Sequence, residues 1–330
     1  MNLKTRYLTL NLESPFIASA SPLTGKIDSL KALEDAGAAA VVLPSLFEEE
    51  LRHDHQRLDI FSAQGADATA EARSYLPNAD LYRRAGHRTL DLIQQAKDAL
   101  QIPVIASING ITADGWSYIA KDMQEAGADA LELNLYHIGN DPDRSGAVIE
   151  AELATVVSQV RATVRLPLAV KVSPWFTSFA HMARHLHEAG ADALVLFNRF
   201  YQPDIDPDAL SLSRRLSLSD SRDLLLPMSW IAMLRPRLRC DFALTSGIHS
   251  AEDAVKALMA GADALMMTSA LLKHGPARLQ EIRANLLAWM EQKGYQGIHE
   301  LRGCMRRDRV PNPDLFERTN YLRLLDSWEA

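Results

Sequence analysis

A repeated pattern of small and apolar residues runs along the chain and predicts half of its strands. Each of four copies has an Ala-Gly-Ala turn followed by a short apolar run, at residues 35–44, 125–134, 188–197 and 259–268. A glycine after a helix suits the left-handed C-cap position. A run that is apolar at odd and even positions is typical of a strand buried on both faces. Each copy therefore predicts a helix end, a turn and a buried strand.

A second set of apolar runs lies between these copies, at residues 15–20, 103–108, 167–172 and 241–245. Helical segments are expected near residues 26–36, 79–100, 115–126, 150–165, 176–189, 220–236, 250–260 and 276–292. Eight alternations of strand and helix are typical of a (β/α)8 TIM barrel, so we expect residues 1–330 to form a single domain of this fold. A doubly wound open sheet is the alternative, but no Gly-x-Gly-x-x-Gly follows the first strand.

Three segments fall outside the alternation. Residues 1–14 predict an N-terminal β-hairpin over the bottom of the barrel. Residues 48–78 and 199–219 are insertions after the second and sixth strands. Long loops at the carboxyl ends of barrel strands serve as lids or substrate contacts, and an oligomer contact is an equally favoured interpretation.

The composition excludes several classes of protein. The chain has 35 basic and 42 acidic residues, so no electrostatic footprint for nucleic acid is expected. Its two cysteines, Cys240 and Cys304, are too few for a disulfide framework or an iron–sulfur site within one chain. No apolar run reaches the roughly 20 residues of a membrane span, and the N-terminus has no signal peptide. We expect a cytoplasmic protein with no metal site.

The carboxyl ends of the strands carry the candidate chemistry. Lys171 lies in an otherwise apolar strand, and a buried lysine needs an anionic partner. That partner is either a bound anionic group or Glu132 on the neighbouring strand, and the position at the strand end favours the bound group.

Amides and hydroxyls follow other strands. Asn134 and Asn198 each end a strand, and an amide can read a polar heterocycle because it offers both a donor and an acceptor. Segments 246–250 and 268–270 precede helices, where barrel loops often bind phosphate through backbone N–H groups. A plain turn with a serine N-cap is the alternative interpretation.

His137 lies three residues after Asn134. A histidine suits general acid–base catalysis near neutral pH. An ordinary loop histidine is an equally favoured interpretation.

Six ordered motifs are spread over nearly the whole chain: Pro15-Phe-Ile-Ala-Ser-Ala, Ala106-Ser-Ile-Asn-Gly, Glu132-Leu-Asn-Leu, Val170-Lys-Val-Ser-Pro, Ser246-Gly-Ile and Thr268-Ser-Ala-Leu. Together they resemble the motifs of the dihydroorotate dehydrogenases, an FMN-dependent group of (β/α)8 barrels that acts in pyrimidine synthesis.

The resemblance implies roles for individual residues. Lys171 would stabilise the anionic reduced flavin. The cofactor site would contain Ala20, Ser21, Asn109, Asn134 and Lys171, with Ser246, Gly247, Thr268 and Ser269 holding the FMN phosphate. The substrate site would contain Asn134, Asn140, Asn198 and Arg199.

Four positions depart from the family pattern. His137 stands where the family has a serine or cysteine as catalytic base, and Arg199 stands where it has a small polar residue. Pro44 and Ala72 stand where the family has a lysine and a substrate-binding asparagine. The residues expected to bind flavin therefore match the family pattern better than the residues expected to determine dihydroorotate specificity.

The resemblance implies an FMN-dependent enzyme that oxidises dihydroorotate to orotate by hydride transfer to flavin N5, with His137 taking the proton. A soluble acceptor such as fumarate and a homodimer are expected. Three alternatives remain open: a flavin oxidoreductase with another cyclic substrate, a flavin-binding barrel without turnover that serves as a partner module, and a phosphate-binding isomerase without flavin.

Overall fold

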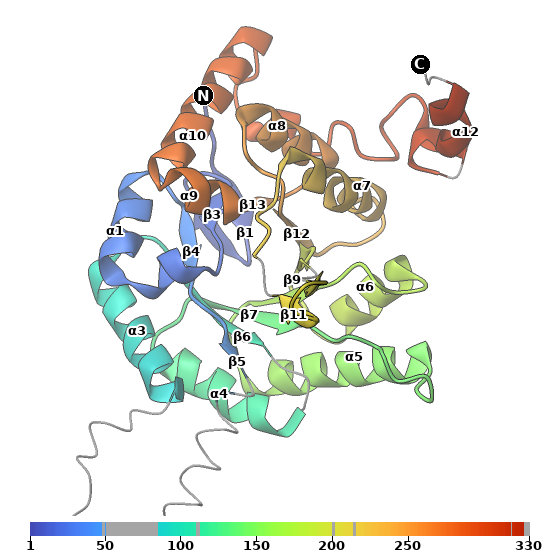
Figure 1. Cartoon of the computed structure of the whole chain (residues 1–330). Helices are drawn as coiled ribbons and strands as arrows, with labels where there is room; N and C mark the ends of the chain where they lie inside the picture. The colour runs from blue at the N-terminus through green and yellow to red at the C-terminus, as the bar shows by residue number, and fades with distance from the viewer. Residues whose placement is uncertain are drawn as a thin grey trace, which may run out of the picture.

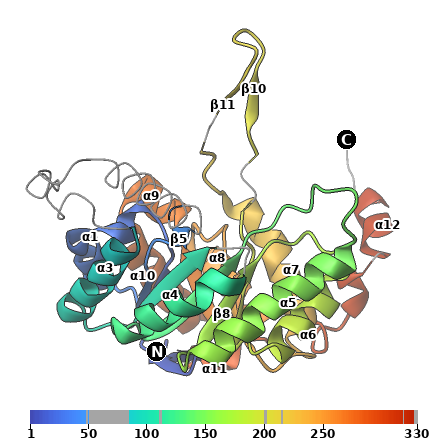
Figure 2. The same cartoon turned by 90° about the horizontal axis from the view of Figure 1, so that it is seen from below.

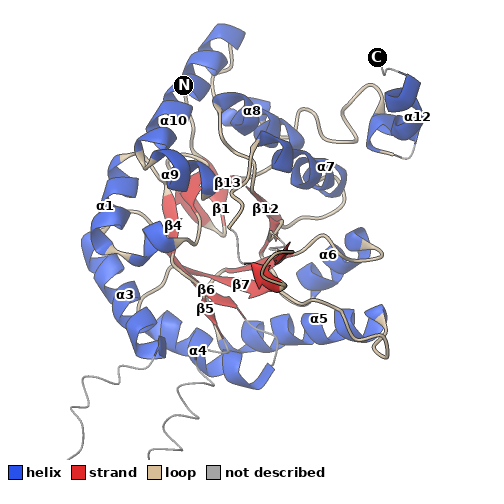
Figure 3. Cartoon of the chain, in the orientation of Figure 1, coloured by secondary structure: helices blue, strands red, loops and turns tan. Residues whose placement is uncertain are grey.

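The computed structural model describes residues 1–47, 50, 85–109, 113–199, 202–213, 216–317 and 319–326. Eight parallel strands in this part close into a barrel that is surrounded by helices (Figures 1 and 3). Their order around the barrel is β3 (Phe16–Ala18), β4 (Ala40–Val42), β6 (Val104–Asn109), β7 (Ala130–Leu135), β8 (Leu168–Val172), β9 (Ala193–Leu196), β12 (Asp241–Thr245) and β13 (Ala264–Met267), which pairs again with β3. The prediction of a TIM barrel is confirmed.

The outer ring contains α1 (Ile27–Asp35), α3 (Ala85–Ala99), α4 (Ala113–Glu125), α5 (Gly146–Thr163), α6 (Phe179–Glu188), α7 (Leu225–Leu234), α8 (Ala251–Ala260) and α10 (Ala277–Lys293). Shorter elements complete the described chain: β5 (Leu46–Phe47), α9 (Ser269–His274), α11 (Ile298–Leu301), α12 (Thr319–Asp326), and the 3-10 turns at Pro22–Gly25, Ser221–Leu224 and Pro313–Phe316. Each predicted helical segment coincides with a helix of the ring.

The predicted N-terminal hairpin is present and closes the amino end of the barrel. Its strands β1 (Thr5–Tyr7) and β2 (Leu10–Leu12) pair antiparallel, and Tyr7 at the end of β1 and Leu8 in the turn are both fully buried. These side chains fill the space left by small interior residues, namely Ala40, Ala130, Ala169, Ala193, Ala243 and Ala264. The lower barrel is therefore a packed core.

Three of the four copies of the repeat carry an aspartate that makes the same kind of contact at the amino end of the barrel. Asp129 accepts a hydrogen bond from the backbone N–H of Val104, at the start of β6, over 2.7 Å, and pairs with Lys97 of α3. The later copies repeat this contact: Asp192 with Leu168 N–H and Arg161, and Asp263 with Phe242 N–H and Arg235. Each aspartate ties a strand to the helix before it.

The insertion after the sixth strand contains an antiparallel hairpin of β10 (Asp204–Asp206) and β11 (Ser211–Ser213). It projects from the end of the barrel opposite the N-terminus (Figure 2). Ile205 and Leu212 pair across the hairpin, and each is 69% exposed. The insertion predicted at residues 48–78 lies outside the described residues, apart from residue 50.

Within the ranges that the structure covers, no helix has the length and apolar character needed to cross a membrane. The same ranges contain no cluster of three or more His, Cys, Asp or Glu side chains that could hold a metal ion.

Candidate functional site

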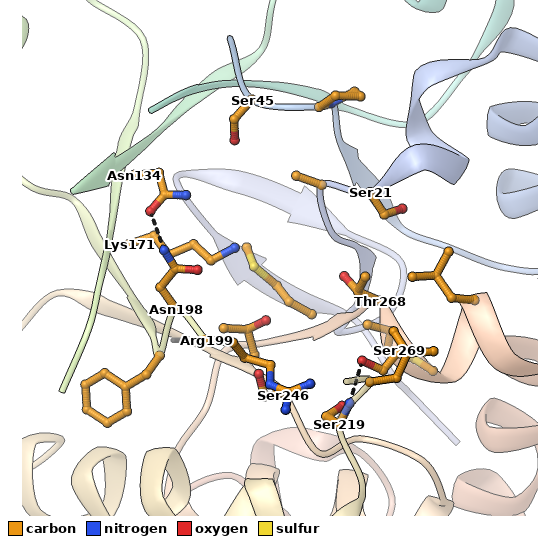
Figure 4. A pocket seen from close by; sticks show the side chains of 18 of the residues that line it. Ser21, Ser45, Asn134, Lys171, Asn198, Arg199, Ser219, Ser246, Thr268 and Ser269 are labelled. Atoms are coloured by element: carbon orange, nitrogen blue, oxygen red, sulfur yellow. Dashed lines mark hydrogen bonds between the residues drawn. The ribbon is translucent and has the colours of Figure 1, made fainter. Parts of the chain in front are cut away.

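A cavity of about 710 Å³ opens at the carboxyl end of the barrel (Figure 4). This volume lies within the range of small-molecule sites. Each barrel strand contributes at least one residue to the cavity lining, either from its end or from the loop after it. These residues are Ala20, Pro44, Asn109, Asn134, Lys171, Phe197, Thr245 and Thr268. The cavity therefore lies where barrel enzymes carry their chemistry.

Most of the residues predicted from the sequence meet in this cavity. Its lining includes Ala20, Ser21, Asn109, Asn134, Lys171, Asn198, Arg199, Ser246, Gly247, Thr268 and Ser269. Two predicted residues do not line it. His137 is partly buried on the loop after β7, and Asn140 is exposed further along the same loop. Tyr136, which the sequence reasoning passed over, lines the cavity in their place.

Lys171 pairs with Glu132, one of the two partners between which the sequence left a choice, and its side chain also lines the cavity. Its ammonium lies 3.6 Å from a carboxylate oxygen of Glu132, and the Lys171 side chain is only 11% exposed. The same ammonium extends into the cavity (Figure 4). The ion pair and the ligand-facing position are therefore compatible.

Asn134 and Asn198 touch each other. Nδ2 of Asn198 donates to Oδ1 of Asn134 over 2.9 Å, above the strand that carries Lys171. The two amides therefore meet directly and do not face one another across an open mouth. Because the bond fixes both side chains, Asn134 Nδ2 and Asn198 Oδ1 point to the cavity as one donor and one acceptor (Figure 4).

The opposite side of the cavity is rich in hydroxyls. Ser246, Gly247, Thr268 and Ser269 gather there, as the phosphate-site prediction requires. Ser219, from the segment after the projecting hairpin, joins them: its backbone N–H donates to Ser269 Oγ over 3.0 Å. Lys273 donates to the backbone oxygen of Ser219 over 2.8 Å and holds this segment against the barrel.

His249 lies behind the hydroxyl side, with its Nε2 atom 3.1 Å from Ser219 Oγ. Burial, reinforced by the nearby Lys273 ammonium, lowers the pKa of His249. Its imidazole is therefore neutral at neutral pH and can either donate to or accept from the Ser219 hydroxyl.

Gly247 is required by packing. Its φ is +83°, and a Cβ at this position would lie 2.3 Å from the backbone nitrogen of Leu224. The sequence indicated a close backbone approach here, and the described neighbour is the start of α7. The glycine lets the 246–250 loop pass under that segment and reach the cavity.

The cavity wall is cationic. Lys171 and Arg199 contribute positive charge, and no aspartate or glutamate is among its described lining residues. Arg199 donates to the backbone oxygen of Ser217 over 2.7 Å and lies 3.9 Å from a carboxylate oxygen of Asp223. Such a wall favours an anionic ligand.

Several polar lining residues were given no role from the sequence, among them Tyr136, Ser45 and Ser219. Tyr136 directly follows the Asn134-Leu135 strand end, so inspection of both faces of that end could have found it. Ser45 lies beyond β4 and shares a 2.7 Å hydrogen bond with Ser107. Ser219 belongs to an insertion without periodic pattern, and no sequence signal places it at the cavity.

The fold and the cavity define a barrel enzyme with a polar, cationic site at its carboxyl end. The comparisons with known proteins narrow this class. The chain is 26% identical over 325 residues to the catalytic subunit of a dihydroorotate dehydrogenase B (NAD(+)) from Methanothermobacter thermautotrophicus, a match that covers 91% of this chain and 97% of that protein.

Two further relatives agree. A protein of Aeropyrum pernix, named as a dihydroorotate dehydrogenase A (fumarate), is 29% identical over 228 residues, 66% of this chain and 72% of that protein. The NAD-dependent dihydropyrimidine dehydrogenase subunit PreA of Escherichia coli is 23% identical over 342 residues, 95% of this chain and 79% of that protein. No protein-family model matches the chain.

These similarities confirm the resemblance that the motifs indicate. Over most of its length the chain is similar to dihydroorotate dehydrogenases, and it is an oxidoreductase of the class that acts on CH–CH groups.

Proposed function

We propose that this protein is an FMN-dependent oxidoreductase that oxidises dihydroorotate to orotate. The observation that carries the proposal is the polarity of one cavity, with Lys171 and the Asn134–Asn198 pair on one side and the hydroxyls of Ser246, Thr268 and Ser269 on the other. A flavin mononucleotide has the matching polarity, with a heterocycle at one end and a phosphate at the other.

The residues fit FMN chemically. The backbone N–H groups and hydroxyls around Gly247 and Ser269 are uncharged donors that suit a phosphate, as in other barrel phosphate sites. Apolar atoms of Met266, Met267 and Ile248 give a ring system a dry surface between the two sides. Ala20, Ser21 and Asn109 complete the proposed cofactor contacts.

FMN, when bound, would accept the two electrons that leave the CH–CH bond of the substrate. Lys171 would stabilise negative charge that develops on the ring. Asn134 Nδ2 and Asn198 Oδ1 would hold the amide groups of a cyclic substrate, and Arg199 would pair with its carboxylate. Asn140 remains a proposed substrate contact from the more exposed part of the β7 loop.

The proton acceptor is proposed on the loop after β7. His137 has the chemistry of a base near neutral pH. It is partly buried and does not line the cavity, whereas its neighbour Tyr136 does. Comparing His137→Ala with Tyr136→Phe assigns the role: the variant that lowers the rate of flavin reduction while FMN stays bound identifies the acceptor.

A second substrate class is supported by two observations. Pro44 occupies a wall position where the resembling family has a lysine, and Arg199 adds a cation on another side. One relative is named for dihydropyrimidines. A different cyclic amide, such as dihydrouracil, is therefore the competing substrate.

The electron acceptor, a partner chain and a homodimer are also part of this proposal. One relative is named with fumarate, which supports a soluble acceptor, and another is named as a catalytic subunit, which supports a partner chain. The exposed Ile205–Leu212 pair supports a homodimer through the projecting hairpin. Light scattering of the parent and of Ile205→Asp tests the dimer.

Anaerobic mixing with substrate tests the function. The flavin absorbance of the purified protein reconstituted with FMN should bleach when dihydroorotate is added. It should not bleach when dihydrouracil is added. Bleaching by dihydrouracil alone would transfer the assignment to the second substrate class. A protein that takes up no FMN would end both proposals.

A further inference from the structure

A buried acidic side chain lies directly below the cavity. Glu132 is fully buried on β7, one interior position below Asn134. Neither of its carboxylate oxygens has a hydrogen bond in the part of the chain that is described. Buried carboxylates nearly always have such partners, so an exception calls for an explanation.

The cation that faces Glu132 is Lys171. The register pairs Glu132 with Ala169 and Asn134 with Lys171, so the lysine lies one level higher on β8 and reaches back to the carboxylate over 3.6 Å. The separation is longer than a hydrogen bond, so the contact is mainly electrostatic. In a dry interior such a contact is strong.

The interior below Glu132 does not compensate its charge. Tyr7 approaches from the N-terminal hairpin, and its hydroxyl also lacks a hydrogen bond to the described residues. Burial, and next the negative charge of Glu132, raise the pKa of Tyr7 well above its ordinary value, with Asp241 acting in the same direction. The phenol is therefore neutral, and the neighbouring charges on that side are negative.

The negative charge of the Glu132 carboxylate lies below the positive charge of the Lys171 ammonium. That ammonium extends into the cavity. A cation beside a flavin favours its anionic reduced form and raises its reduction potential. A carboxylate behind that cation opposes the effect, because it cancels part of the positive field and ties the ammonium toward the barrel interior.

We propose that Glu132 is a positioning residue that holds the Lys171 ammonium at the floor of the cavity and lowers the reduction potential of the flavin bound there. The inference rests on the proposed flavin function. Glu132 is not among the described residues that line the cavity, and it acts only through Lys171. Its hydrogen-bond deficit follows from this arrangement, since a carboxylate saturated by backbone donors would hold the lysine less strongly.

The test is the midpoint potential of bound FMN, measured by anaerobic reduction against a reference dye. Glu132→Gln keeps the shape and removes the charge, so the potential should move in the positive direction. Glu132→Asp keeps the charge but shortens the side chain, so a smaller positive shift is expected. Lys171→Gln should move the potential in the negative direction.

The outcomes separate this inference from the proposed function. A parent protein that binds no FMN contradicts the proposed function itself. A parent that binds FMN, with Glu132→Gln and Glu132→Asp both at the parent potential, overturns only the role of Glu132. Each of the two variants decides alone if the other fails to fold. If neither holds FMN, Glu132 serves the fold and the inference is wrong.

Discussion

The two ends of the barrel use charged residues in opposite ways. At the amino end, Asp263 accepts from the Phe242 N–H and pairs with the guanidinium groups of Arg235 and Arg302. At the carboxyl end, the ammonium of Lys171 lies 3.6 Å from a carboxylate oxygen of Glu132 and faces a cavity. Charges with several partners stabilise a fold, whereas a charge with an open side can bind a ligand.

The largest expected effect comes from removing the charge pairing at the amino end of the barrel. Asp263→Ala should lower the free energy of unfolding by about 3–5 kcal/mol, because it leaves Arg235, Arg302 and the Phe242 N–H without their shared acceptor. Burial raises the pKa of Asp263 to about 6, with both arginines opposing the rise. Urea unfolding should therefore be measured near pH 8, where the carboxylate is ionised.

Asp192→Ala is the matched control for that variant. Asp192 occupies the same place in the repeat, but its side chain is 42% exposed. Water can replace its partners, so a loss of about 1 kcal/mol is expected. Equal losses in the two variants would contradict the view that burial and partner number set the strength of these aspartates.

The next effect concerns the carboxyl end. Lys171→Met should lower the rate constant of flavin reduction by about 10²–10³-fold, because a positioned charge that stabilises developing negative charge is lost. Rapid-mixing absorbance measures this rate. Lys97→Met is the control, since Lys97 pairs with Asp129 at the amino end. It should lower stability and leave the reduction rate unchanged, and similar rates in both lysine variants would remove Lys171 from the chemistry.

The smallest expected effect comes from comparing substitutions at two glycines, Gly247 and Gly294. Gly247→Ala should cost about 1–3 kcal/mol and weaken FMN binding, because φ is +83° and the new Cβ meets the Leu224 backbone. Gly294→Ala has a similar φ of +78° with nothing near its Cβ. It should show only the backbone cost. Unfolding and FMN titration of the pair isolate the contact with Leu224, and identical results would show that this contact is unimportant.

The barrel could be predicted because its signal is local and repeated. The Ala-Gly-Ala turn and the buried strand after it recur four times, and a second set of apolar runs alternates with them, so eight strands and their helices follow from the pattern. Lys171, Asn134 and Ser269 all line the cavity because strand ends converge in a barrel, and their roles stay predictions.

The rest of the site depends on contacts between distant segments. Ser219 reaches the cavity because Lys273, far along the chain, holds its backbone oxygen. Tyr136 and His137 are neighbours, yet only Tyr136 lines the wall, and sequence spacing alone does not give the direction of a loop. The 48–78 insertion, predicted as a lid or an oligomer contact, stays a prediction.

Titration of the FMN-free protein with FMN, followed by quenching of flavin fluorescence, tests the central claim that the carboxyl-end cavity holds this cofactor. The account predicts saturation at a single FMN per chain. It also predicts weaker binding of riboflavin, which lacks the phosphate for the Ser246–Ser269 side. Absence of quenching, or equal affinity for riboflavin and FMN, would contradict the account.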